Sequence, residues 1–318
     1  MSLLMPALAL LIERLVGYPR PLFAAIGHPV TWMGALISWL EARLNHGEAR
    51  RWKGVAMLGF LLATCLAAGI VLVALTHLVP FGWVIEALLA SSLLAQKELG
   101  RAVQAVADGL GRSLGEGRQA VSQIVGRDPE TLDEAGVARA AVESLAESTS
   151  DGVVAPLFWL ILGGLPGILL YKAANTADSM VGHRTARYAE FGWASARFDD
   201  LVNWIPARLS ALLIAGAAFL VRRADPEAAW GTALRDAKKH DSPNAGWPEA
   251  AFAGALGFEL GGPRMYDGEI HQLPSFGDGR AGLGPLDILK SLELYWMAMN
   301  LLLGVTLGLA LAGWRILA

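Results

Sequence analysis

An uncharged apolar segment is the feature that most limits what this chain can fold into. Residues 54–79 contain no Asp, Glu, Lys or Arg, and Lys53 and Pro80 mark their two ends. A helix of about 20 apolar residues is long enough to cross the hydrocarbon core of a bilayer. The whole chain is only 17% charged, whereas soluble domains are roughly a quarter charged. We therefore predict an integral membrane protein that has the lipid bilayer as a partner.

Other apolar segments complete an expected set of spans and partial spans. The first is short and ends at Glu13, whereas the last carries Trp296 and Trp314 as interface anchors. The predicted set is 3–16, 54–79, 83–100, 152–171, 204–221 and 293–314. We therefore predict an all-α polytopic protein with one membrane-embedded domain over residues 1–318, in which polar helices and loops form a site at the membrane edge.

Glycine and proline interrupt the apolar segment 152–171 at its centre, where the sequence reads Gly163-Gly164-Leu165-Pro166-Gly167. This composition favours a broken or re-entrant helix. Lys and Arg are abundant in the polar segments on both sides, and the positive-inside rule places such segments in the cytoplasm. Simple alternation of full spans cannot achieve that, so we expect 152–171 and 204–221 to be inserted only in part.

Charge, cysteine content and motifs exclude several classes of function. The net charge of −3 gives no indication of a nucleic-acid partner. The single Cys65 allows no disulfide framework and suggests no structural zinc site. The sequence contains no Walker GxxxxGK[ST], GxGxxG, HExxH or CxxC motif.

Three acids precede the interrupted segment at a spacing of four. Glu143, Glu147 and, if the helix continues so far, Asp151 would share one helical face. Neighbouring carboxylates repel each other unless a cation lies among them, and oxygen ligands of this kind suit Mg²⁺. The alternative is a solvated helix face on which Arg139 pairs with Glu143.

A second polar group follows the interrupted segment. Its members are Lys172, Asn175, Asp178, His183, Arg184 and Arg187. The cationic members are suited to phosphate or carboxylate groups of a substrate. Lys172 also has a purely structural explanation, because a lysine at the membrane edge can extend its ammonium group to water.

Paired acids stand shortly before the next apolar segment. Asp199 and Asp200 precede Leu201, Val202 and Asn203. Acids are favoured at helix N-termini, so this pair is equally well explained by a helix start as by a functional site.

A basic turn is the last candidate, within the sequence RDAKKHDSPNAGWPEAAFAGALG. Asp241, Pro243 and Gly246 are strong turn formers. A turn that carries cations and oriented donors can bind an anion. The predicted anion-binding groups are Lys238, Lys239, His240, Ser242 and Asn244. The alternative is a surface loop whose lysines follow the positive-inside rule.

Four segments of the chain, in order, resemble signature segments of the CobD/CbiB family. They read AVESLAESTSDGVVAPLFW, YKAANTADSMVGHR, FGWASARFDDLVNWIPARL and HDSPNAGWPEAAFAGALG. Two more, GHPVTWMGALISWLEARLN and GGPRMYDG, are similar to segments near the two ends of the family's pattern. The resemblance covers about residues 1 to 315. Ser148 stands where many members have Asn, and a serine keeps a side chain that can form hydrogen bonds.

The resemblance implies the activity of adenosylcobinamide-phosphate synthase, an enzyme of cobalamin biosynthesis in the inner (plasma) membrane. Such an enzyme uses ATP and Mg²⁺ to join a carboxylate of adenosylcobyric acid to the amine of (R)-1-amino-2-propanol O-phosphate. ATP makes the carboxylate reactive, as an acyl phosphate or an acyl adenylate. Because ATP is available in the cytoplasm, the active site should face it. The sequence is compatible with a homo-oligomer.

The polar clusters fit the parts of such a reaction. Acids can hold Mg²⁺ on the triphosphate, cations can neutralise phosphates, and a carboxylate or imidazole can take a proton from the attacking ammonium. The expected catalytic residues are Glu147, Asp151, Asp178 and His183. The expected metal ligands are Glu143, Glu147 and Asp151. The expected substrate-binding residues are Lys172, Asn175, Arg184, Arg187, Lys238, Lys239, His240, Ser242 and Asn244.

Two functions of other classes compete with this interpretation. One is a non-enzymatic membrane regulator of the AmpE type, which should keep the spans and lose the polar segments; this chain has them. The other is a corrinoid transporter. Transporters concentrate polar residues within their spans near the bilayer midplane, whereas most polar residues here fall in loops.

Overall fold

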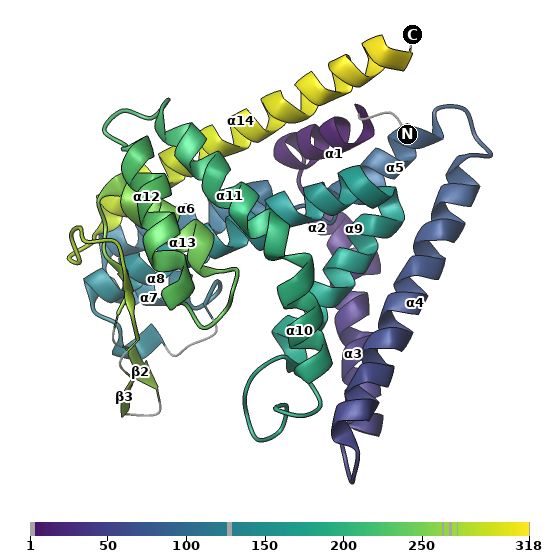
Figure 1. The fold of residues 1–318 in the computed structure, drawn as a ribbon, viewed down its shortest axis with the longest axis horizontal. Helices are drawn as coiled ribbons and strands as arrows, with labels where there is room; N and C mark the ends of the chain where they lie inside the picture. Colours follow the sequence, from purple (N-terminus) through teal and green to yellow (C-terminus); the bar gives the residue numbers. More distant parts are fainter. Residues whose placement is uncertain (1–3, 126–128, 263, 267–268, 272, 318) are drawn as a thin grey trace. The chain divides into compact units, whose positions relative to one another are not determined.

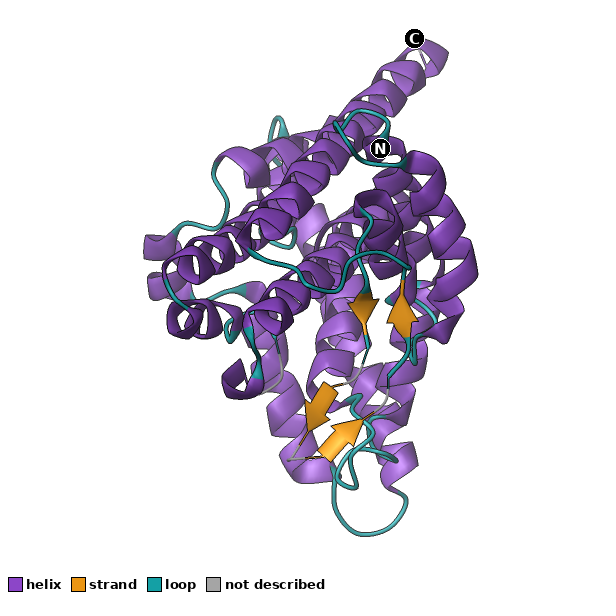
Figure 2. Ribbon diagram, turned by 90° about the vertical axis from the view of Figure 1, so that its left-hand side faces the viewer, coloured by secondary structure: helices purple, strands orange, loops and turns teal. Residues whose placement is uncertain are grey.

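The computed structural model describes residues 4–125, 129–262, 264–266, 269–271 and 273–317. Its described part is almost entirely helical (Figure 1, Figure 2). The helices are α1 Leu4–Leu15, α2 Arg20–Ile26, α3 Pro29–Leu44, α4 Arg50–Thr76, α5 Gly82–Ser91, α6 Gln96–Arg112, α7 Leu114–Val121, α8 Glu134–Thr149, α9 Ala155–Val181, α10 Trp193–Val202, α11 Trp204–Ala218, α12 Pro226–Asp236, α13 Gly246–Leu256 and α14 Pro285–Leu317. The prediction of an all-α fold is confirmed.

Short strands between α13 and α14 are the exception to the helical fold. β1 (Leu260–Gly261) pairs antiparallel with β4 (Ser275–Phe276), and β2 (Arg264–Tyr266) pairs antiparallel with β3 (Glu269–His271). Figure 2 shows the two pairs in orange. They fold a polar segment back on itself and fix the position of the loop that follows β4.

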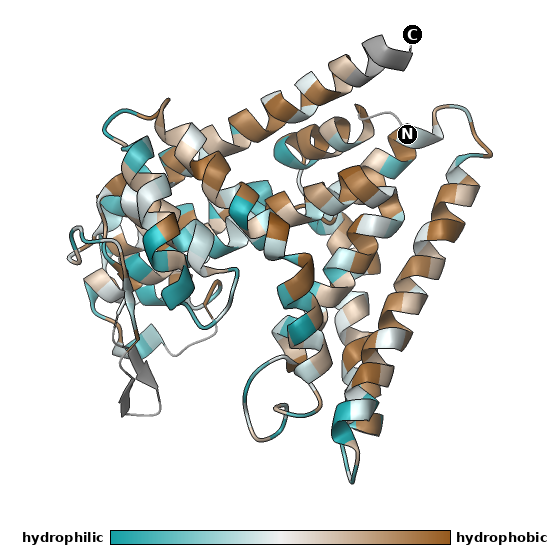
Figure 3. Ribbon diagram, in the orientation of Figure 1, coloured by the Kyte–Doolittle hydropathy of each residue, from teal (hydrophilic) through white to brown (hydrophobic). Residues whose placement is uncertain are grey.

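Several helices are long and apolar enough to cross a membrane. The candidates in the described part of the chain are 20–44, 50–76, 134–181 and 285–312, with a fifth if α10 and α11 form one broken span. Figure 3 shows α4 as hydrophobic along most of its length. A polytopic membrane protein is therefore confirmed.

One predicted segment is divided between two helices. Residues 83–100 do not form one helix, because α5 ends at Ser91 and α6 begins only at Gln96. At 1.5 Å per residue, neither α1 nor α5 reaches the roughly 30 Å of a bilayer core by itself.

The break predicted in the segment 152–171 is confirmed. Gly164 has φ 61° and ψ −152°, outside the helical region, and Pro166 follows two residues later. Glycine tolerates a positive φ that a Cβ would oppose. Upstream, the chain passes from α8 to α9 through one π-helical turn, Ser150–Val154. The stretch from α8 to α9 is therefore irregular at two places.

Contacts divide the chain into two compact units, which the sequence did not predict. Unit 1 comprises residues up to 95, 155–203 and those from 306 onward, and unit 2 comprises 96–154 and 204–305. In unit 1, α9 packs against α3, α4 and α10. A Cβ on Gly69 of α4 would lie 2.7 Å from Cα of Pro166, so a small residue is needed where α4 meets the break in α9.

Unit 2 is held together by small and aromatic side chains. α12 packs on α13, α13 on α11, and α6 on α7 and α8. Gly254 of α13 fits closely against α12, because a Cβ there would lie 2.2 Å from the carbonyl oxygen of Ala228. The buried Tyr295 of α14 donates its hydroxyl hydrogen to the carbonyl of Gln96 at 2.7 Å. These contacts position α8 and the turn after α12, which carry the predicted polar groups of this unit.

Candidate functional site

A buried carboxylate, Asp199 of α10, is the centre of a polar cluster in unit 1. It is 9% exposed and accepts hydrogen bonds from Nδ2 of Asn203 at 2.9 Å and Nδ2 of Asn175 at 3.4 Å. The Tyr171 hydroxyl in turn donates to Oδ1 of Asn203 at 3.0 Å. Lys172 follows Tyr171 on α9 and is half-buried, with Nζ 6.0 Å from the centre of the Tyr171 ring. The cluster thus joins two helices through side-chain amides.

Helical spacing explains how two sequence segments build this cluster. Tyr171, Asn175 and Asp178 fall on one face of α9, and Asp199 and Asn203 are one turn apart on α10. Among the described residues, no cation forms an ion pair with Asp199. A buried carboxylate without a compensating cation is costly for the fold. Such groups are candidates for function.

Two further acids and the loop after α9 complete the cluster. Asp178 and Asp200 are half-buried, and the carboxylates of Asp178, Asp199 and Asp200 repel one another. His183 lies near Asp178, and the cation Arg184 lies near Asp200; the side chains of His183 and Arg184 are both exposed. The structure therefore brings together the predicted residues Asn175, Asp178, His183 and Arg184. Asp199 and Asp200 lie toward the end of α10, so a helix-start preference within this helix does not explain them.

Arg187, which the sequence assigned to substrate binding, has an internal partner. Its Nε and Nη2 donate to the two carboxylate oxygens of Glu41 at 3.1 and 3.0 Å. Nδ2 of Asn45 donates to the same carboxylate at 2.8 Å. The hydrogen bonds to Glu41 raise the pKa of Arg187 above its ordinary value. Arg187 therefore fastens the loop after α9 to α3, and it could bind a substrate only if this ion pair opened.

The three acids before α9 do not share one environment. Glu143 is buried, and its Oε1 accepts a hydrogen bond from the backbone N–H of Gly261 at 2.7 Å. Glu147 is exposed, and Asp151 is half-buried in the π-helical turn that follows α8. Asp151 thus follows α8 in a turn with a wider hydrogen-bond pattern, so the regular α-helix that carries Glu143 and Glu147 ends before it. In the described part of the chain, no three His, Cys, Asp or Glu side chains gather as a metal site.

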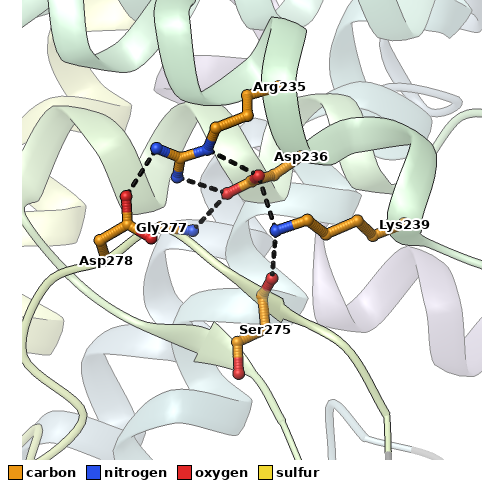
Figure 4. Close-up of polar contacts among 6 residues, drawn as sticks. All are labelled: Arg235, Asp236, Lys239, Ser275, Gly277 and Asp278. Atoms are coloured by element: carbon orange, nitrogen blue, oxygen red, sulfur yellow. Dashed lines mark hydrogen bonds and ion pairs between the residues drawn. The ribbon is translucent and has the colours of Figure 1, made fainter.

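The basic turn after α12 is organised by a second buried carboxylate, Asp236 (Figure 4). Its side chain is 0% exposed. Asp236 accepts two hydrogen bonds from Arg235, at 2.8 and 2.7 Å, and its Oδ1 lies 2.8 Å from Nζ of Lys239. The backbone N–H of Gly277 donates to it at 2.9 Å. The hydrogen bonds from Arg235 hold the pKa of Asp236 well below its ordinary value.

Lys239 and Arg235 reach beyond Asp236 to the loop after β4. Lys239 donates to the carbonyl of Ser275 at 3.5 Å, and Arg235 forms an ion pair with Asp278 at 2.6 Å (Figure 4). We predicted from the sequence that Lys239 binds a phosphate. In the structure its positive charge is compensated by Asp236. The i, i+3 spacing of Asp236 and Lys239 was a signal for this pair.

The other residues of the basic turn stabilise its shape or face outward. Nδ1 of His240 accepts from the backbone N–H of Ser242 at 2.9 Å, and the Ser242 hydroxyl accepts from the backbone N–H of Asn244 at 3.2 Å. Arg208 of α11 donates to Oδ1 of Asn244 at 3.2 Å, an anchor that sequence reasoning missed. Lys238 is exposed and makes no ion pair within the described residues. Of the five predicted anion-binding groups, Lys238 is the cation most accessible to a ligand.

Comparison with known proteins gives a consistent result over nearly the whole chain. The family described as CobD/Cbib protein matches residues 6–295. A protein of Brucella suis biovar 1 is 46% identical over 98% of both chains. A Sinorhizobium protein is 48% identical over 97% of this chain and 98% of its own. A protein of Rhodobacter capsulatus is 48% identical over 98% of both. All three are called cobalamin biosynthesis protein CobD, and no solved structure matches the chain significantly.

Proposed function

Since the chain belongs to the CobD/CbiB family, we propose that it acts in cobalamin biosynthesis as adenosylcobinamide-phosphate synthase. In this reaction the carboxylate of adenosylcobyric acid and the amine of (R)-1-amino-2-propanol O-phosphate form an amide, with ATP as co-substrate. The observation that carries the proposal is the 45–48% identity to CobD proteins over nearly full length. The aligned region includes every polar segment named above, so the similarity is not confined to the apolar helices.

The cluster around Asp199 is the best candidate in unit 1 for moving a proton. An alkyl ammonium must lose a proton before its nitrogen can attack a carbonyl carbon. Asp178 is half-buried and beside the exposed His183, so either group can accept that proton. Asn175 and Asn203 orient the neighbouring carboxylate of Asp199. We assign Asp178 the role of proton acceptor and Asp199 the role of its positioning partner.

Mg²⁺ fits the acids of unit 2 in a smaller set than the sequence predicted. Mg²⁺ keeps several waters and is commonly held by one or two carboxylates together with substrate phosphates. Glu147 is exposed and Asp151 is half-buried, so an ion can reach their carboxylate oxygens, whereas Glu143 is buried beneath Gly261. We propose Glu147 and Asp151 as the ligands. The bound ion would neutralise negative charge on the phosphates of ATP.

The basic turn is our candidate for the phosphate of the aminoalcohol. Lys238 supplies an accessible positive charge, and the hydrogen bonds through His240, Ser242 and Asn244 keep the turn in one shape. A fixed turn loses little conformational entropy when it binds a ligand. The Asp236 ion pairs fasten the same turn to the loop after β4.

Reconstitution tests the proposed reaction directly. The purified protein in lipid nanodiscs is incubated with adenosylcobyric acid, ATP, Mg²⁺ and the aminoalcohol phosphate, and the corrinoid products are separated and weighed by mass spectrometry. We expect adenosylcobinamide phosphate only when all four components are present. Folded protein that consumes no ATP and forms no amide under these conditions would contradict the proposal. In cells, a deletion strain should grow on cobinamide but not on cobyric acid.

The metal assignment has a separate test. Glu147→Gln and Asp151→Asn should each abolish ligation and leave membrane insertion unchanged. If a substitution at Glu147 or Asp151 leaves some activity, the Mg²⁺ concentration needed for half-maximal rate should rise in that variant. Such a rise would identify the substituted residue as a Mg²⁺ ligand. Wild-type rates in both variants would remove these acids from the site.

The proposed location is the inner membrane, with the polar segments 96–151, 172–203 and 222–292 in the cytoplasm. Single cysteines are introduced after replacement of Cys65, and intact cells are treated with an impermeant thiol reagent. We expect labelling only after the cells are opened. Labelling of a residue between 180 and 200 in intact cells would place that loop outside.

A further inference from the structure

An apolar cavity of about 710 Å³ lies within unit 1 and contains none of the residues assigned to the reaction. Its walls come from α1 to α5 and from the part of α9 just after the break at Gly164. Three of the candidate spans, 20–44, 50–76 and 134–181, contribute to these walls. The cavity therefore belongs to the part of the protein that lies in the bilayer.

Polar side chains in the wall already donate their hydrogen atoms to backbone carbonyls. The Tyr18 hydroxyl donates to the carbonyl of Gly27 at 2.7 Å, and the Trp32 indole N–H donates to the carbonyl of Ile26 at 2.9 Å. The hydroxyls of Thr64, Ser91 and Ser92 donate to carbonyls one turn earlier in their own helices, at 2.8, 2.7 and 2.7 Å. The lining of the cavity is consequently apolar.

This chemistry restricts the occupant. A buried water needs two to four polar partners, and these side chains already bond to the backbone. An empty cavity would lose the dispersion contacts of its lining. Leu22, Ile26 and Leu88 line the cavity and are 41%, 52% and 52% exposed, so the cavity opens among apolar side chains at the surface of the unit. A flexible hydrocarbon chain can enter from the bilayer and fill it.

Positive charge beside the cavity indicates which hydrocarbon chain fits. Arg20 is exposed and follows directly after the wall residue Pro19, and Arg14 is in the last turn of α1. Arginine binds lipid phosphates through charge-assisted hydrogen bonds. We propose that the cavity binds an acyl chain of an anionic membrane phospholipid, whose phosphate lies at Arg20.

Native mass spectrometry of the intact protein with added phosphatidylglycerol tests the proposal. Wild type should retain one phospholipid after the detergent is removed. Ala68 lines the cavity on α4, so Ala68→Phe fills it and should abolish the adduct. Ala63 is an exposed residue of the same helix outside the cavity, and Ala63→Phe should keep the adduct. Equal retention in Ala68→Phe and wild type would overturn the proposal, as would equal loss in the two Phe variants.

A second filling variant and a headgroup test complete the experiment. If Ala68→Phe does not fold, Leu72→Trp, which fills the same wall, replaces it under the same criteria. Arg20→Gln should remove any preference for phosphatidylglycerol over phosphatidylcholine and should retain an adduct. An unchanged preference would overturn the role of Arg20. A lipid-free dimer in wild type, converted to monomer by Ala68→Phe, would show that a second copy of the chain occupies the cavity instead.

Discussion

Asp199 in unit 1 and Asp236 in unit 2 are both buried carboxylates, yet their surroundings differ in charge. Asp236 accepts hydrogen bonds from the Arg235 guanidinium and a backbone N–H, and it pairs with the ammonium of Lys239. Asp199 accepts from two neutral amides and lies near another carboxylate, Asp178. One negative charge is therefore compensated by its neighbours and the other is not.

The difference separates structural roles from chemical roles. A compensated carboxylate contributes to stability, and its cations are no longer available to a ligand. An uncompensated one reduces stability and is retained where its reactivity is needed. By the same criterion, two cations are structural: Arg187, which pairs with Glu41, and Lys239, which pairs with Asp236. Two others, Lys238 and Arg184, are exposed to solvent.

The strongest test of the comparison is Asp199→Asn. If Asp199 supports proton transfer at Asp178, kcat should fall about 100-fold or more, the range of general acid–base catalysis. The melting temperature should be unchanged or higher, because the substitution removes an uncompensated buried charge. Both quantities are measured on the same preparation in detergent.

Asp200→Asn is the matched control, since the neighbouring Asp200 is half-buried and lies 3.7 Å from Arg197. A fall in melting temperature for Asp199→Asn, with normal kcat in the protein that remains folded, would give Asp199 a structural role like that of Asp236.

Asp236→Ala should lower stability, in contrast to Asp199→Asn. It leaves Arg235, Lys239 and the Gly277 N–H without their shared acceptor, and we expect a loss of about 2–3 kcal/mol in stability. Thermal unfolding followed by circular dichroism measures it. Asp278→Asn, which removes a partner that is 79% exposed, should change stability little. Similar losses in the two variants would show that Asp236 is not the centre of this cluster.

The two adjacent lysines should separate binding from stability. Lys238→Ala should raise KM for the phosphorylated amine about three- to tenfold and leave the melting temperature unchanged, because an exposed charge contributes modestly. Lys239→Ala should lower the melting temperature and leave KM nearly constant. An amine without phosphate should show no KM effect in Lys238→Ala. Equal effects on both amines would remove the basic turn from phosphate binding.

The smallest expected effect is the loss of the stability that Asp236 contributes when the pH is lowered. Its pKa in the folded state lies below the unfolded value of about 3.9. The stabilisation is therefore fully present above about pH 5 and is lost as the pH falls through the folded-state pKa. The difference in melting temperature between wild type and Asp236→Asn should narrow from pH 5 to pH 3. A constant difference over this range would mean that the Asp236 charge does not stabilise the fold.

The sequence by itself determined the class of the protein, the broken helix and the family. These follow from local properties: an uncharged apolar segment is stable in a bilayer, and Gly164 with Pro166 cannot continue a regular helix. The helical spacing of Asn175 and Asp178 was also visible in the sequence, and both residues lie on α9.

Tertiary structure alone decided which of those groups remain available for chemistry. Arg187 meets Glu41 across 146 positions of sequence, and Asp199 meets Asn175 across 24. No local pattern contains such pairs, because the energy of a charge depends on what surrounds it in space. Tertiary structure also decided that Glu143 is buried against the backbone of Gly261 whereas Glu147 is exposed. The sequence therefore identified the charged residues, whereas their neutralisation or exposure followed from the packing of distant helices.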